Sequence, residues 1–224
     1  MSSPVKYFFD LMSQPSRAMY IIFKLSGSKV QNVPVALRKG EHLTEKFRDE
    51  VNKFQKVPCI VDGDFKLAES IAILRYMARK EEIKETLYPI SEKSSRLLSK
   101  VDEFLEWQHL TLRLSCGSAF RMKWLEPMMG IQREEKQIKE FEKLMEVNLN
   151  IMENVWLKDT PFVTGNELTA ADIFGACEIE QTKLFGYNAG TNRPKVDAWL
   201  KKVREATNPS YDEAHAFVFK MSKL

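Results

Sequence analysis

Ser13 is the residue whose type and position most suggest chemistry. It follows a β-prone run, Val5–Phe9, and a break at Asp10. Pro15 suits the first turn of a helix, where no backbone donor is needed, so a helix is expected to begin directly after Ser13. A hydroxyl and the free N–H groups of a helix start can together stabilise a small anion. Taken alone, the pattern fits either such an anion site or an ordinary helix cap.

Two dipeptides farther along the chain could contact the same ligand. Val57-Pro58 starts a β-prone stretch, and a cis bond there would leave the Val57 backbone groups for pairing with an extended peptide. Glu69-Ser70 opens a helical pattern, where the hydroxyl suits a carboxylate and the Glu69 side chain suits an ammonium group. A trans proline and a plain helix cap are the alternatives at these positions.

Lys39, His42 and Lys56 add cationic groups to this set. Lys39 and His42 belong to a polar loop that also fits a solvated turn, and Lys56 also fits a plain surface charge. If all these groups converge, they describe a ligand that is zwitterionic at one end, anionic at the other and peptide-like between. Glutathione has that shape, with a γ-glutamyl head, a cysteinyl centre and a glycine carboxylate.

The composition is that of a soluble globular protein, with 44% apolar and 29% charged residues in a chain of 224. The net charge of +3 is too small to indicate nucleic-acid binding, so no nucleic-acid partner is expected. Residues 1–80 hold 14 Lys and Arg against 8 Asp and Glu. This excess suits an anionic ligand, and it equally fits charges scattered over the surface.

Cysteine usage indicates a reducing compartment. Cys59, Cys116 and Cys177 are far apart and show no metal-ligand spacing, so neither zinc nor a disulfide framework is expected. Buried free thiols in the cytoplasm are the simplest interpretation. The N-terminus lacks a secretory pattern, and no apolar run approaches membrane-spanning length. We therefore expect a cytoplasmic protein with no metal and no membrane contact.

Residues 1–80 predict a mixed α/β unit of order β-α-β-α-β-β-α. Asp62-Gly63 is a strong hairpin signal between two apolar runs, and the earlier crossovers favour parallel strands beside it. The expected strands are Val5–Phe9, Val33–Leu37, Lys56–Val61 and Phe65–Ala68; the expected helices follow Ser13, span Leu43–Glu50 and begin at Glu69-Ser70.

Residues 93–224 predict helices only, after a charged linker at 81–92 that contains Pro89. Thr169 and Asp172 have the spacing of a capping box at one helix start. The other helices are expected at Arg96–Trp124, at Glu134–Trp156 and, as the last one, at Pro194–Ala206. A short α/β part followed by a longer helical part indicates two domains, 1–80 and 93–224.

The chain resembles theta-class glutathione S-transferases over essentially its whole length. The segments specific to that class are Ser13-Gln14-Pro15 and the stretch from Trp107 to Arg113 (Trp-Gln-His-x-Thr-Leu-Arg). Segments shared with the wider superfamily, or matching less specifically, are Lys39–Leu43, Lys56–Pro58, Asp62–Leu74 and Thr169–Ile173. The resemblance implies an α/β thioredoxin-like N-terminal domain and an all-α C-terminal domain, the architecture of cytosolic glutathione transferases.

The resemblance also implies roles for individual residues. Ser13 matches the catalytic serine of the family, and Arg113 matches a basic residue that lines the active-site cleft. The expected glutathione contacts are His42 at the glycine carboxylate, Lys56 and Val57 along the cysteinyl backbone ahead of the cis-proline Pro58, and Glu69 and Ser70 at the γ-glutamyl group. Glutathione is implied as co-substrate without a cofactor, small hydrophobic electrophiles as second substrates, and a homodimer as the assembly.

The electrophile pocket is expected to be apolar. Candidate lining residues are Leu11, Met12, Leu110, Phe120 and Trp124, although Met and aromatic residues at helical spacing also fit a core. The sequence departs from the family pattern where Asn52-Lys53 replaces Asn-Pro, and it stops at Leu224, earlier than some theta enzymes. A more open pocket is therefore expected, and a preference for small halogenated substrates is not carried over.

The expected chemistry is activation of a thiol. A free thiol has a pKa of about 8.5 and is mostly protonated at neutral pH, whereas the thiolate is the nucleophile. A Ser13 hydroxyl donor beside a helix start would favour the ionised sulfur, and a shift of ~2 pKa units corresponds to ~2.7 kcal/mol. The result would be conjugation of glutathione to electrophiles, with reduction of organic hydroperoxides as a further possibility.

Three alternatives remain open from the sequence. Tyr7 could be the donor instead, but it falls inside the first strand. A thiol-disulfide or dehydroascorbate activity would need Cys at position 13, where the chain has Ser. A non-catalytic glutathione-binding or ligand-carrier protein on the same fold is the alternative outside enzymes, and the presence of Ser13 favours the enzyme.

Overall fold

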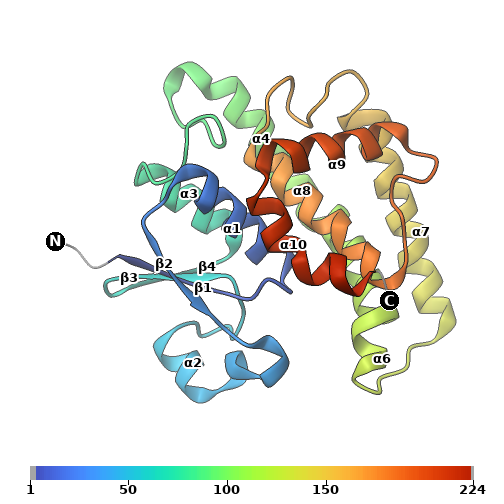
Figure 1. Ribbon diagram of the computed structural model, residues 1–224, viewed down its shortest axis with the longest axis horizontal. Helices are drawn as coiled ribbons and strands as arrows, with labels where there is room; N and C mark the ends of the chain where they lie inside the picture. The colour runs from blue at the N-terminus through green and yellow to red at the C-terminus, as the bar shows by residue number, and fades with distance from the viewer. Residues whose placement is uncertain (1–3, 223–224) are drawn as a thin grey trace.

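A four-stranded mixed sheet forms the N-terminal part of the protein, whose computed structural model describes residues 4–222. The strand order is β2-β1-β3-β4 (Figure 1). β1 (Val5–Phe9) pairs in parallel with β2 (Val30–Pro34) and antiparallel with β3 (Cys59–Asp62), and β3 pairs antiparallel with β4 (Phe65–Ala68). The predicted Asp62-Gly63 hairpin is confirmed.

Helices cover both faces of this sheet, with α1 (Gln14–Ser26) and α3 (Ser70–Arg79) on one side and α2 (Glu45–Glu50) on the other (Figure 1). Alternate side chains of β1 pack into the helical layers on the two faces of the sheet, because successive strand residues point to opposite faces. Val5, Tyr7 and Phe9 are buried in the main core, whereas Phe8 packs against the smaller cluster around Phe47 of α2. The first strand and the helix after Ser13 therefore form as predicted.

Two strand predictions in this part are wrong in their bounds. The second strand is Val30–Pro34 rather than Val33–Leu37, because pairing with β1 starts at Val30 and the chain then turns into the short 3-10 helices η1 (Leu37–Lys39) and η2 (Glu41–Leu43). The third strand begins at Cys59 rather than Lys56. Pro58 has no N–H to donate to the ladder, so pairing starts just after it.

The rest of the chain is helical, as predicted. The helices are α4 (Ser95–Leu110, after the 3-10 helix η3, Glu92–Ser94), α5 (Leu112–Phe120), the short π-helix η4 (Arg121–Leu125), α6 (Glu126–Met128), α7 (Glu135–Ile151), the short π-helix η5 (Met152–Trp156), α8 (Ala170–Glu180), the 3-10 helix η6 (Gln181–Phe185), α9 (Pro194–Thr207) and α10 (Ser210–Met221). Among the described residues no helix is long and apolar enough to cross a membrane.

Two helix predictions are corrected. The helix expected at Arg96–Trp124 breaks at Thr111, whose backbone (φ −118°, ψ −83°) leaves the helical region between α4 and α5. Neither Pro nor Gly marks this break in the sequence. The helix from Pro194 is also not the last, because α10 starts at Ser210, directly after Asn208-Pro209.

α8 is the centre of the helical part, and every one of its residues is buried. Gly175 allows this close packing, because a Cβ there would lie 2.9 Å from the Phe104 ring. The predicted capping box is present at its start, where the Asp172 carboxylate accepts from the Thr169 N–H at 3.0 Å. Asp172 also accepts from the Trp199 indole N–H at 2.8 Å, which ties α9 to α8.

α1 belongs to both parts of the molecule, because it packs on the sheet with one side and on α8 and α10 with the other. The segment between α3 and α4 is also held by both parts: Tyr88 donates to Asp102 at 2.8 Å, Arg75 of α3 pairs with the same carboxylate, and the Leu87 carbonyl accepts from the Ala170 N–H at 2.8 Å. The α/β part and the helical part thus share one continuous core.

Candidate active site

The sheet register brings the predicted site segments to one edge. Phe8, Cys59 and Ala68 are neighbours across β1, β3 and β4. The chain therefore leaves β1 toward Ser13, enters β3 from Val57-Pro58 and leaves β4 toward Glu69-Ser70 at the same edge. Phe9 pairs with Pro34 there as well, so the 36–42 loop starts beside them.

Ser13 caps α1, as predicted, but its side chain is only loosely held. Its Oγ accepts from the Ser16 N–H at 3.4 Å, and its hydroxyl donates to the Val57 carbonyl at 3.4 Å. Both contacts are at the long end of hydrogen-bond range. A stronger acceptor placed beside Ser13 could therefore replace the Val57 carbonyl as the acceptor of the hydroxyl hydrogen bond, at little cost in free energy.

Asp10, which the sequence prediction did not include, connects the Ser13 turn to the neighbouring loop. One carboxylate oxygen accepts from the Met12 N–H at 2.8 Å and the other from the Leu37 N–H at 3.0 Å. The Asp10 carbonyl accepts from the Ser13 N–H at 2.9 Å. An Asp after a strand is a common turn residue, so its sequence context could have indicated this role.

His42 lies half-buried in η2, and its Nδ1 is buried without a hydrogen-bond partner among the described residues. Burial lowers the pKa of His42, which the nearby Asp10 carboxylate only partly opposes. The neutral ring can still donate one N–H bond to a carboxylate. Lys39, in the same loop, is exposed.

The remaining sheet-edge residues have unusual backbone geometry. The Val57-Pro58 bond is cis, and Lys56 beside it is exposed while its carbonyl accepts from the Asn52 side chain at 2.7 Å. Glu69 has φ of 67°, which is sparsely populated for a non-glycine residue. It is the N-cap residue of α3, so Ser70 is the first helical residue, as predicted.

The helical part reaches this edge through α5. Gly117 of α5 faces Gln14, the residue after Ser13: a Cβ built at Gly117 would lie 3.8 Å from the Gln14 side-chain nitrogen. Arg113, one turn earlier, is partly exposed and pairs through Nη1 with the buried Glu178 carboxylate at 2.6 Å. That ion pair fixes the Arg113 side chain against α8.

The apolar candidates fall into different environments. Leu11 packs against the main core, Met12 is half-buried beside Ser13, and Leu110 is 73% exposed on α4. Phe120 and Trp124 stack on each other at 5.5 Å in a separate cluster with α10. The structure shows no contact of Leu110 with Ser13 among the described residues, and its place in a pocket stays a prediction.

Phe217 of α10 was missed by the sequence analysis, because that helix was not predicted. Its ring packs against Trp124 at 6.2 Å, and the Arg38 guanidinium of η1 lies 5.1 Å above it. Arg38 comes from the loop that follows β2, so this contact joins the sheet edge to the aromatic cluster. Such a wall, apolar with a cationic rim, suits an organic electrophile.

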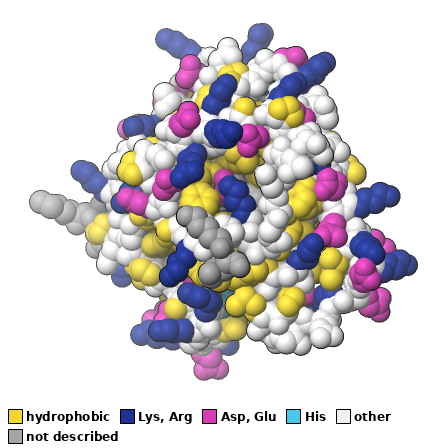
Figure 2. Space-filling model, turned by 45° about the vertical axis from the view of Figure 1, so that its right-hand side comes forward, with side chains coloured by type: hydrophobic (Ala, Val, Ile, Leu, Met, Phe, Trp, Pro, Cys, Tyr) yellow, Lys and Arg dark blue, Asp and Glu magenta, His cyan; other side chains and the backbone are white. Residues whose placement is uncertain are grey.

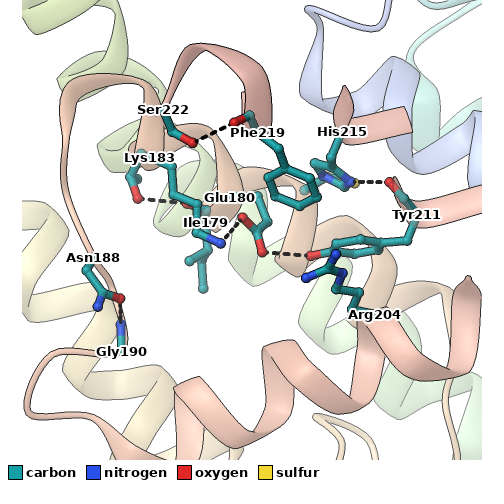
Figure 3. Close-up of polar contacts among 12 residues, drawn as sticks. Ile179, Glu180, Lys183, Asn188, Gly190, Arg204, Tyr211, His215, Phe219 and Ser222 are labelled. Atoms are coloured by element: carbon teal, nitrogen blue, oxygen red, sulfur yellow. Dashed lines mark hydrogen bonds and ion pairs between the residues drawn. The ribbon is translucent and has the colours of Figure 1, made fainter. Parts of the chain in front are cut away.

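A cleft of about 170 Å³ lies elsewhere, between the end of α8, η6 and α9 (Figure 3). Its three cationic side chains are already paired with acidic ones: Lys183 with Glu180, Lys201 with Asp197, and Arg204 with Asp212. The paired carboxylates offset the positive charge of the cleft, and none of the sequence-predicted site residues lines it, so it is not the candidate site.

Charges of both signs are interspersed on the face shown in Figure 2. Apolar side chains lie between the charged ones, and no large region of a single charge sign covers this face.

Within residues 4–222, no group of three or more His, Cys, Asp or Glu side chains is arranged to hold a metal ion. All three cysteines are free and buried, and burial raises the pKa of the Cys59 and Cys177 thiols to about 12.

Comparison with known proteins assigns the fold. Residues 3–79 match the glutathione S-transferase N-terminal domain and residues 67–206 match its C-terminal domain. The chain belongs to the glutathione S-transferase family, and the predicted pairing of a thioredoxin-like domain with an all-α domain is confirmed.

Within that family the chain is similar to the theta class. It is 35% identical over 219 residues to glutathione S-transferase theta-1 of Rattus norvegicus, covering 97% of this chain and 90% of that protein. The structure of human glutathione S-transferase T1-1 has a TM-score of 0.88 at 33% identity, covering 98% of this chain and 91% of that one. Human theta-2, solved in complex with glutathione, has a TM-score of 0.90 at 31% identity, covering 98% and 89%.

Proposed function

We propose that Ser13 activates glutathione for attack on electrophiles in this glutathione transferase. The observation that carries the proposal is the Ser13 hydroxyl, which lies at the start of α1 and is held only by two contacts of 3.4 Å. A thiolate placed there would accept a hydrogen bond from the Ser13 hydroxyl and face the positive end of the α1 dipole. Both effects lower the pKa of the bound thiol.

The converging sheet-edge groups would hold the tripeptide. Glu69 would pair with the γ-glutamyl ammonium, and Ser70 with its carboxylate at the start of α3. The Val57 backbone would pair with the cysteinyl residue, with Pro58 setting the chain direction there. Lys56 would lie along the cysteinyl backbone, and the Nδ1 side of His42, which has no partner among the described residues, would receive the glycine carboxylate.

The electrophile would then approach from the helical part. The glutathione sulfur forms a bond to the electrophilic carbon, the leaving group departs with its electron pair, and Ser13 keeps its own proton. Holding both reactants together supplies proximity and orientation. The proposed walls of this pocket are Arg113, Leu11, Met12, Leu110 and the Phe120–Trp124 cluster.

Ser13→Ala tests the thiolate proposal. We expect the bound thiol to titrate ~2 pKa units higher and kcat/KM at pH 7 to fall about 25-fold, because the hydroxyl donor is lost and less of the thiol is ionised. The loss should shrink at alkaline pH, where thiolate forms without help. Ultraviolet absorbance of the thiolate, titrated with pH, measures the shift directly.

Ser16→Ala is the matched control, since the Ser16 Oγ is buried without a partner among the described residues and only its backbone N–H meets Ser13. It should leave both the thiol pKa and turnover unchanged. If Ser13→Ala binds glutathione and turns over like the parent, the proposed donor is eliminated.

The electrophile remains to be identified by assay. A panel of an aryl halide, an alkyl halide, an isothiocyanate and cumene hydroperoxide would separate conjugation from peroxide reduction, which uses the same thiolate. Turnover of the hydroperoxide that is lost in Ser13→Ala would assign peroxidase activity to this site. Turnover of none of the four by the parent protein would favour the ligand-carrier alternative.

We further propose a cytoplasmic homodimer. Three buried free thiols suit a reducing compartment, and exposed Leu97 and Leu114 offer apolar surface on the neighbouring helices α4 and α5. Sedimentation at micromolar concentration should give a species twice the 26.0 kDa chain mass. A single monomer-sized species would contradict the dimer.

A further inference from the structure

Arg17 is fully buried in α1, four residues after Ser13. Its Nη1 donates to the Leu11 carbonyl at 2.9 Å and to the Met12 carbonyl at 3.3 Å. Its Nη2 donates to the Cys177 carbonyl at 3.1 Å and to the Gln181 side-chain oxygen at 2.5 Å. One planar group therefore connects the turn that precedes Ser13 to the end of α8 in the helical part.

This arrangement depends on arginine. A guanidinium presents several N–H donors in a fixed fork, so it can bond to four acceptors on opposite sides at once. A lysine ammonium is a compact point charge at the end of a flexible chain and cannot reproduce this geometry. Burial lowers the pKa of Arg17, and the nearby Glu178 and Glu180 are among the groups that oppose this effect.

The turn before Ser13 is clamped from two sides. Asp10 accepts from the Met12 N–H at 2.8 Å, and its carbonyl accepts from the Ser13 N–H at 2.9 Å. Arg17 holds the carbonyls of Leu11 and Met12 on the other side. The Ser13 side chain itself makes only the two contacts of 3.4 Å, so the direction of its hydroxyl depends on how this main chain is held.

We propose that Arg17 is a positioning residue that couples the helical part of the molecule to the thiol-activating serine. It fixes the main chain of residues 11–12, and through it the place of the Ser13 hydroxyl. The inference rests on the proposed role of Ser13 and adds that packing of α8 against α1 contributes to the acidity of the bound thiol.

Tyr211 provides a comparison within the same buried interface. Its hydroxyl donates to the Glu180 carboxylate at 3.1 Å, and its carbonyl is 2.9 Å from the His215 Nδ1 (Figure 3). None of these hydrogen bonds reaches residues 11–13. Tyr211→Phe therefore removes a buried polar contact between helices without touching the turn.

The experiment compares Arg17→Lys with Tyr211→Phe in the full chain. For each variant we would measure the pKa of bound glutathione by thiolate absorbance, KM and kcat, the melting temperature, and amide hydrogen exchange at residues 11–13. Arg17→Lys should raise the thiol pKa by ~1 unit, lower kcat/KM about threefold at pH 7 and speed exchange at residues 11–13. Tyr211→Phe should lower only the melting temperature.

A lower melting temperature in Arg17→Lys with an unchanged thiol pKa and unchanged exchange at residues 11–13 would overturn the proposal, because the residue would then be purely structural. If Arg17→Lys does not fold, Gln181→Met serves instead. It removes one acceptor of Nη2 at similar side-chain size, and it should shift the thiol pKa and the exchange in the same direction by a smaller amount. An unchanged thiol pKa and exchange in Gln181→Met would equally overturn the proposal.

Failure of the proposed function would look different. Bound glutathione would then titrate near 8.5 in the parent protein, and Ser13→Ala would not change it. Amide exchange at residues 11–13 would still report whether Arg17 holds the turn, so this measurement tests that part of the proposal independently of the role of Ser13.

Discussion

The edge of the sheet and the packing around α8 are both rich in polar groups, but they hold their key side chains differently. At the sheet edge, Ser13 makes only long contacts and His42 leaves a ring nitrogen unpartnered among the described residues. Around α8, Arg17 donates four hydrogen bonds through Nη1 and Nη2, although its Nε has no partner among the described residues, and Asp172 accepts from a side chain and a main-chain group at 3.0 Å or less.

The difference separates two uses of polarity. Buried groups that make several short hydrogen bonds inside the protein fix geometry, and removing one partner leaves the other buried and unpaired. Groups that are loosely bonded are ready for a ligand, because little is lost when they change partner. Substitutions around α8 should therefore change stability, and substitutions at the sheet edge should change binding.

Asp172→Asn should give the largest effect on stability. The carboxylate accepts from the N–H groups of Thr169 and Val163 and from the Trp199 indole, and an amide NH₂ would face donors instead of accepting from them. We expect the free energy of unfolding to fall by about 3 kcal/mol in chemical denaturation. Asp197→Asn, a control whose side chain is 47% exposed, should change it by less than about 0.5 kcal/mol. Equal losses in the two variants would contradict the comparison.

His215 should make the packing around α8 sensitive to acid. Burial lowers the pKa of His215 well below 6.5, so below pH 6.5 the unfolded chain takes up a proton that the folded protein excludes. Stability should fall by about 1.4 kcal/mol per pH unit as the pH drops from 6.5 toward the folded-state pKa. Denaturation between pH 7 and 5 should show a shallower slope for His215→Gln than for the parent. The exposed His109→Gln should keep the parent slope; identical slopes in all three would refute this origin.

Glu69 tests whether strain is stored at the sheet edge. Glycine tolerates the φ of 67° without a Cβ penalty, so Glu69→Gly should gain about 1 kcal/mol of stability, while Glu69→Gln should keep the strain. Both variants lose the carboxylate proposed to hold the γ-glutamyl ammonium, and both should raise KM for glutathione. A melting temperature of Glu69→Gly below that of Glu69→Gln would show that the backbone is not strained there.

Gly117→Ala should give the smallest change in stability, and Gly175→Ala should change stability in the opposite direction. Alanine there meets nothing closer than 3.8 Å, so Gly117→Ala should stabilise α5 by about 0.5–1 kcal/mol. Gly175→Ala in α8 should instead destabilise the protein, because its Cβ would lie 2.9 Å from the Phe104 ring. Thermal melts of the two variants should therefore shift in opposite directions.

Local signals in the sequence predicted most of the N-terminal part. The hairpin turn, the Ser13 cap and the start of α3 depend on short-range chemistry, and all three are confirmed. The edge strand β2 was displaced by three residues, because its register is set by pairing with β1 rather than by its own residues. The convergence of the site segments depends on the antiparallel pairing of β1 with β3, which the hairpin signal between β3 and β4 does not reveal.

Features set by tertiary packing were not predictable. The break at Thr111 carries no Pro or Gly, and α10 follows Asn208-Pro209, a sequence that reads as the end of a helix rather than the start of one. Arg17 is charged, and such residues are almost never fully buried unless they are paired. Two of its four acceptors lie about 160 positions away, so no local pattern could assign its role.

The double-sided burial of α1 limits how this chain can be recombined with its relatives. A chimera that joins residues 1–80 to the helical part of another protein inherits a helix shaped for α8 and α10 of this one. Such a graft needs an acceptor side chain at the position of Gln181, or the Arg17 charge is left without one of its four acceptors. Soluble yield of chimeras with and without that glutamine would show how strictly the two parts must be inherited together.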